Sequence, residues 1–126
     1  MVNALDMKRL DPAQDSAIDM AVLDQILDMG DARLRAALLE QLLADFRRLS
    51  EALMQDGWDE VSAAAHELKG LAATIGAHRL AQLAKRLDTV ADCAIPGELG
   101  EFRSPVEGEM RIVLDTLAMQ ARRVQS

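Results

Sequence analysis

The chain has few aromatic residues, although half of its residues are hydrophobic. Its 126 residues include two phenylalanines, one tryptophan and no tyrosine. A core of aliphatic side chains suits interlocking helices better than a β-sandwich, in which aromatic and β-branched residues dominate. A chain of this length corresponds to one domain. We therefore predict a single all-α domain.

Lysine and arginine are outnumbered by acidic residues, and this excludes one class of partner. Fourteen basic residues against 21 acidic ones give a net charge of −7. A protein that binds nucleic acid needs a basic face for the phosphates. We therefore expect no nucleic-acid partner, and acidic substrates are disfavoured for the same reason.

Signals for membranes, disulfides and metals are also lacking. No stretch reaches the ~18 apolar residues of a membrane span, and the N-terminal sequence lacks the apolar run of a signal peptide. The single cysteine, Cys93, cannot form an internal disulfide, and no metal-ligand spacing such as CxxC occurs. We expect a soluble, cytoplasmic protein that does not bind membranes and has no metal site.

Apolar residues recur at helical spacing along most of the chain. The spacing predicts a short helix capped by Asp19, long helices over Ala32–Met54 and Trp58–Gly76, and a helix containing Leu80 to Val90. Asp31 is the expected cap of the second helix. Residues 1–17 have no such period and are predicted to be a flexible arm, so that residues 18–126 form the domain. Short connections and narrow apolar stripes favour an antiparallel four-helix bundle with a short extra N-terminal helix.

The run Ser-Pro-Val-Glu at positions 104–107 is typical of a helix start. Ser104 suits the N-cap, Pro105 the first helical position, and Glu107 the third position after the cap. Residues 92–103, which contain one proline and two glycines, show no clear period. We therefore predict a loop over residues 92–103 and a last helix that begins after Ser104 and runs to Val124.

His66 interrupts the predicted helix over Trp58–Gly76. At about 100° per residue, the apolar stripe of this helix centres roughly 130° from His66, so the imidazole faces outward. A histidine in the core with a satisfied hydrogen bond is the usual alternative, and the period of the stripe argues against it. The helical neighbours of His66 are Lys69, the more distant Asp59, and the small residues Ser62, Ala63, Gly70 and Ala73. A neutral imidazole on such a low patch is a competent nucleophile that a partner protein can approach.

Gly70 lies nearly opposite the apolar stripe of the same helix. Glycine inside a helix costs about 1 kcal/mol relative to alanine. Close packing in the core is the ordinary reason for such a glycine, and its position argues against that reason. We interpret Gly70 as a residue that leaves room for a partner.

These residues resemble the histidine-containing phosphotransfer (HPt) domain family. The motif of that family is an HxLKG run followed by a glycine ten positions after the histidine. The matching positions here are His66, Leu68, Lys69, Gly70 and Gly76. The resemblance is specific from Trp58 to Asp88 and looser from Ile18 to Val124.

The resemblance implies a phosphoryl carrier rather than an enzyme. His66 would accept a phosphoryl group from a phosphorylated aspartate of one receiver domain and return it to another, with Lys69 stabilising the phosphate. The expected docking residues are Ser62, Ala63, Gly70 and Ala73, and Gly76 is expected to be structural. Expected partners are response-regulator receiver domains and a hybrid histidine kinase. The protein is expected to be a monomer without a cofactor of its own, and Mg²⁺ is expected on the receiver.

Two other functions stay open at this point. An HPt-like bundle could dock to a kinase or receiver and regulate it without carrying phosphate. The presence of both His66 and Lys69 favours the carrier. A hydrolase that uses His66 as a base has less support, because no nucleophile is identifiable near it.

Overall fold

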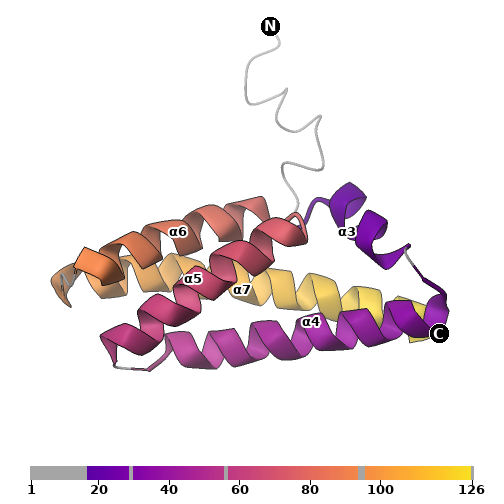
Figure 1. The fold of residues 1–126 in the computed structure, drawn as a ribbon, viewed down its shortest axis with the longest axis horizontal. Helices are drawn as coiled ribbons and strands as arrows, with labels where there is room; N and C mark the ends of the chain where they lie inside the picture. The colour runs from indigo at the N-terminus through magenta and orange to yellow at the C-terminus, as the bar shows by residue number, and fades with distance from the viewer. Residues whose placement is uncertain (1–16, 29, 56, 94–95, 126) are drawn as a thin grey trace, which may run out of the picture.

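The structure is a computed structural model that describes residues 17–28, 30–55, 57–93 and 96–125. These residues form five helices and no strand: α3 (Met20–Leu27), α4 (Ala32–Leu53), α5 (Trp58–Thr74), α6 (His78–Cys93) and α7 (Pro96–Gln125). Figure 1 shows α4 to α7 as four long helices, with consecutive helices running in opposite directions, and α3 at one end. The predicted all-α bundle with a short N-terminal helix is confirmed. The arm predicted for residues 1–17 lies outside the described residues, except for Ala17.

The four long helices enclose one core of mostly aliphatic side chains. Both α4 and α6 pack against α5 and α7. The largest fully buried side chains include Phe46 of α4, Leu68 of α5, Leu87 of α6 and Leu117 of α7. Each helix buries only one face, which is why the apolar residues recur every three or four positions. None of the helices in the described ranges is both long and apolar enough to cross a membrane.

Two aspartates cap helices as the sequence predicts. The Asp19 carboxylate accepts a hydrogen bond from the Ala21 backbone N–H at 3.1 Å, at the start of α3. The Asp31 carboxylate accepts one from the Leu34 N–H at 2.9 Å, at the start of α4. Each bond satisfies a backbone donor that has no partner within its own helix.

The predicted start of the last helix is wrong. α7 begins at Pro96, so Ser104 is not its N-cap and Pro105 lies inside the helix. A proline in a helix interior costs about 3 kcal/mol or more, because it removes a hydrogen bond and crowds the preceding turn. Tertiary contacts on both sides of Pro105 offset this cost: Val106 is fully buried, and half-buried Phe102 packs against the core. The preference of proline for the first helical position holds at Pro96.

Arg103 joins this part of α7 to the end of α4. Its Nη1 donates hydrogen bonds to the backbone oxygens of Leu53, at 2.9 Å, and Gln55, at 3.0 Å. The last carbonyls of a helix have no partner within the helix. α7 therefore provides hydrogen-bond partners for carbonyls at the end of α4. The prediction of a loop over residues 92–103 could not take this contact between distant segments into account.

The turn between α5 and α6 fixes the position of α3. Gly76 has a φ of 85°, and its carbonyl accepts a hydrogen bond from the Asp19 N–H at 2.8 Å. A Cβ at Gly76 would lie 2.9 Å from Val22 Cβ and 3.0 Å from the Asp19 oxygen. Both the left-handed backbone and the close approach of α3 therefore require glycine here.

Candidate functional site

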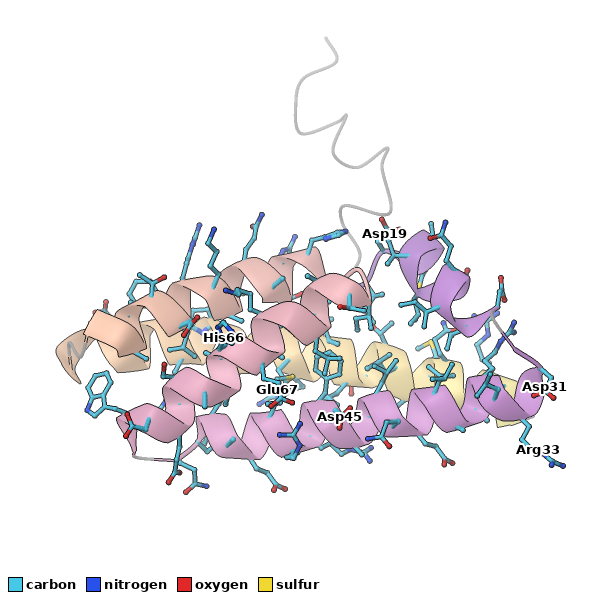
Figure 2. The ribbon with its side chains drawn as sticks, in the orientation of Figure 1. Asp19, Asp31, Arg33, Asp45, His66 and Glu67 are labelled. Atoms are coloured by element: carbon cyan, nitrogen blue, oxygen red, sulfur yellow. The ribbon has the colours of Figure 1, made fainter. Side chains whose placement is uncertain are left out.

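His66 lies in the middle of α5 and points away from the core. Its side chain is 72% exposed, whereas Ala65 and Leu68 on the same helix are fully buried. Figure 2 shows His66 on the side of α5 toward α6, and Glu67 on the side toward α4. The orientation is the one that the helical period predicts.

The carboxylate of Asp88, on α6, contacts one nitrogen of the His66 ring. His66 Nδ1 lies 3.3 Å from Asp88 Oδ2, and the aspartate side chain is 15% exposed. A carboxylate only accepts hydrogen bonds, so this bond places the proton on Nδ1 and the lone pair on Nε2. Nε2 makes no hydrogen bond within the described part of the chain. The pair therefore favours the tautomer with the proton on Nδ1, on a side chain that is 72% exposed.

Two further polar groups surround the Asp88 carboxylate. Lys69 Nζ lies 3.9 Å from the oxygen that also contacts His66, and the Ser62 hydroxyl donates to the other oxygen at 3.5 Å. Lys69 follows His66 by one helical turn, and its side chain is 37% exposed. Its ammonium group and the His66 ring therefore lie beside the same carboxylate oxygen.

Small side chains surround His66 on the outer face of α5. Ala63, Gly70 and Ala73 are exposed, while Ser62 is half-buried because it turns toward Asp88. A Cβ at Gly70 would meet nothing within 4 Å. Packing within the described residues therefore does not require a glycine at position 70, and the space above it is open to a partner.

On its other side, α5 is tied to α4 next to the site. Arg48 donates hydrogen bonds to the carboxylate of Glu67, with Nη1 3.4 Å from Oε1, and Asp45 lies 3.9 Å from the same guanidinium group. The hydrogen bond and the charge of Glu67 raise the pKa of Arg48 above its usual value. Because Glu67 is the neighbour of His66, this exposed contact lies beside the candidate site.

Asp88 is a residue of the candidate site that the sequence analysis missed. It lies 22 positions after His66 and on another helix, so no helical spacing connects the two. One signal was available: Asp88 follows Leu87 directly and Ala84 by four positions, and both of those residues are fully buried. An acidic residue at the edge of an apolar stripe faces a neighbouring helix, where it needs a polar partner.

The model of one family, the Hpt domain, matches residues 33–123. The chain belongs to the Hpt domain family. No curated protein and no solved structure gives a significant match. Hpt domains take part in phosphotransfer within His–Asp phosphorelays, in which they interact with receiver domains and histidine kinases. In this Hpt domain, His66, Lys69 and Asp88 all lie within the matched residues.

Proposed function

We propose that this Hpt domain relays a phosphoryl group between receiver-domain aspartates through a phosphohistidine at His66. The observation that carries the proposal is the His66–Asp88 pair, in which Nδ1 is held at 3.3 Å from a carboxylate oxygen while the side chain stays 72% exposed. A nucleophile of this kind has to be accessible to a partner and oriented by a third group.

The chemistry of phosphoryl transfer follows from the tautomer of His66 that has its proton on Nδ1. The Nε2 lone pair attacks the phosphorus of an aspartyl phosphate on the receiver. The N–P bond forms as the O–P bond breaks, and the electron pair of that bond stays on the receiver's carboxylate. The imidazole becomes positively charged, and the carboxylate of Asp88 offsets this charge beside Nδ1–H. Return of the phosphoryl group to a second receiver is the same step in reverse.

Lys69 and the small residues of α5 support this step in different ways. The Lys69 ammonium group leaves its contact with Asp88 and pairs with the phosphate oxygens once the ring is phosphorylated. Ser62, Ala63, Gly70 and Ala73 form the surface on which the receiver docks, since short side chains let the reacting atoms approach within about 3–3.5 Å.

The proposal also places the protein in its cellular setting. The phosphoryl group comes from a hybrid histidine kinase and passes to response-regulator receivers in the cytoplasm. The carrier acts as a monomer and needs no cofactor, because the Mg²⁺ that assists the transfer belongs to the receiver. It has no catalytic turnover of its own.

The second candidate is a docking module that regulates a kinase or receiver without being phosphorylated. A docking surface needs small and exposed residues, which α5 has around Gly70. It does not need an imidazole whose Nδ1 is paired with a carboxylate that is only 15% exposed. The His66–Asp88 pair therefore favours the carrier.

Labelling with phosphorylated receivers tests the proposal. Each purified receiver domain of the source organism is phosphorylated with a radioactive donor and mixed with the wild-type chain, His66→Gln or His78→Gln. The second histidine is a matched control because its side chain is also exposed, at 63%. We expect acid-labile, alkali-stable label on wild type and His78→Gln and none on His66→Gln. Label on His66→Gln, or no label on wild type from any receiver, would contradict the proposal.

A further inference from the structure

Over residues 78–91, the part of α6 whose side chains the structure describes, the exposed face is basic, although the chain as a whole is acidic. The exposed residues within this range are His78, Arg79, Gln82, Lys85, Arg86 and Thr89. None of them is acidic, whereas the net charge of the chain is −7. The acidic side chain of Asp88 is 15% exposed and faces α5. Positive charge is therefore gathered on one face, next to the helix that presents His66.

A groove of about 490 Å³ lies on this face, between α6 and the first part of α7. It is lined by Gln82, Lys85, Arg86, Thr89, Val90 and Phe102, and we call it the α6 groove. Phe102 is half-buried and packs against the core, while Lys85 and Arg86 are exposed. The groove thus combines apolar side chains with two neighbouring cations.

The two cations of the α6 groove have no acidic partner among the described residues. By contrast, Arg48 pairs with Glu67, and Arg79 lies 4.0 Å from a carboxylate oxygen of Glu109. Two adjacent cations without counter-charges repel each other, and an approaching anionic group relieves this repulsion. The charge of the α6 groove is therefore available to a partner.

The α6 groove lies close enough to His66 for one partner protein to contact both. Lys85 precedes Asp88 by three positions and so lies one turn away on α6. A stable interface covers about 800 Å² on each protein, which corresponds to a disc of about 16 Å radius. Packed helix axes are only about 8–10 Å apart. A protein centred over His66 on α5 therefore also reaches α6.

We propose that the α6 groove is the electrostatic docking contact for the acidic surface of the protein that exchanges phosphoryl groups with His66. This inference rests on the proposed function. Mg²⁺ at a phosphoryl-transfer site is held by carboxylates together with the phosphate oxygens. The surface around the partner's reacting aspartate is therefore acidic and complements Lys85 and Arg86. Complementary charge of this kind speeds association more than it changes the chemical step.

Charge reversal tests this contact. Lys85→Glu/Arg86→Glu is compared with Arg33→Glu/Arg111→Glu, which changes the net charge equally at two exposed arginines that have no ion pair in the described structure. Association of each receiver that labels the wild type is measured by surface plasmon resonance, with phosphoryl uptake followed in parallel. At 50 mM salt we expect the groove variant to associate about tenfold more slowly than wild type, and the control variant less than threefold. At 500 mM salt the difference should fall below threefold, because salt screens exposed charges. Uptake at saturating receiver should equal that of the wild type.

The outcomes separate this inference from the proposed function. If the groove variant associates like the wild type, or the control variant slows association as much, the docking contact is wrong while phosphotransfer stands. If no receiver labels the wild type, both proposals fail. Sedimentation of the wild type gives one more outcome: a dimer that Lys85→Glu/Arg86→Glu abolishes assigns the groove to a second copy of the chain, and our inference is then overturned.

Discussion

Two glycines six positions apart, one on α5 and one in the turn that follows it, have opposite surroundings. Gly70 lies on the outer face of the helix, where an added Cβ would meet nothing within 4 Å. Gly76 has a left-handed backbone and lies in contact with α3. The presence of glycine therefore has a different physical cause at each of the two positions. The fold requires Gly76, while no contact among the described residues requires Gly70, which lowers helix stability. We propose that Gly70 leaves room for a partner that approaches His66.

Gly76→Ala should give the largest effect on the fold. A left-handed backbone costs about 1–2 kcal/mol for a residue with a Cβ, and overpacking against Val22 and Asp19 adds about 1–3 kcal/mol. We expect the free energy of unfolding to fall by about 2–5 kcal/mol in urea denaturation. Phosphoryl transfer per folded molecule should stay at the wild-type rate. A wild-type midpoint in urea would mean that the turn is not required.

Apart from substitution of His66 itself, Lys69→Ala should give a large effect on transfer at a residue that the fold does not need. A charge-assisted hydrogen bond to phosphate is worth about 1.5 kcal/mol at the lower end, which corresponds to about tenfold in rate. We expect phosphoryl uptake to slow, or the phosphohistidine to decay faster, by about that factor, with little change in thermal stability. Arg47→Ala, which removes an exposed cation of α4, is the control for the change in charge. Unaltered uptake and lifetime in Lys69→Ala would leave Lys69 as an ordinary surface residue.

Substitution of Gly70 should change stability less than substitution of Gly76 and in the opposite direction. Gly70→Ala should stabilise the chain by up to about 1 kcal/mol, because alanine is the better helix former and the site is open. Gly70→Gln should fold as well as the wild type but bind receivers weakly and exchange phosphoryl groups slowly, since its side chain lies one turn from the reacting nitrogen.

The matched control for these variants is Gly108, an exposed glycine of α7 whose Cβ would also meet nothing within 4 Å. Gly108→Ala and Gly108→Gln should change stability in the same direction and leave transfer unaltered. A loss of more than about 1 kcal/mol in Gly70→Ala would show that the site is packed. Transfer at the wild-type rate in Gly70→Gln would place the docking surface elsewhere.

Features with a local cause could be predicted from the sequence. The caps at Asp19 and Asp31 depend on residues two or three positions away, and the outward direction of His66 depends on the period of one helix. The fold class follows from the same periods, because a stripe on each long helix has to be covered by the others. The position of Lys69 one turn from His66 also depends on one helix alone, so it could be predicted as well.

Features that depend on contacts between distant helices could not be predicted. Asp88 reaches His66 across 22 positions, and only the packing of α6 against α5 brings them together. The run at Ser104 and Pro105 has the residue types of a helix start, yet Arg103 and Val106 hold it within α7. Tertiary contacts therefore outweigh the local preference of these residues for a helix start, as they commonly outweigh helix propensity.

The hydrogen bonds of Arg103 have a consequence for how this end of the bundle opens. The guanidinium group of one helix satisfies carbonyls at the end of another, 50 positions earlier for Leu53 and 48 for Gln55. Fraying of the last turn of α4 therefore exposes a cation of α7, and local unwinding of α7 before Pro105 leaves carbonyls of α4 without partners. Neither end can loosen alone at low cost, so the two segments form one cooperative unit whose amide protons exchange with solvent together.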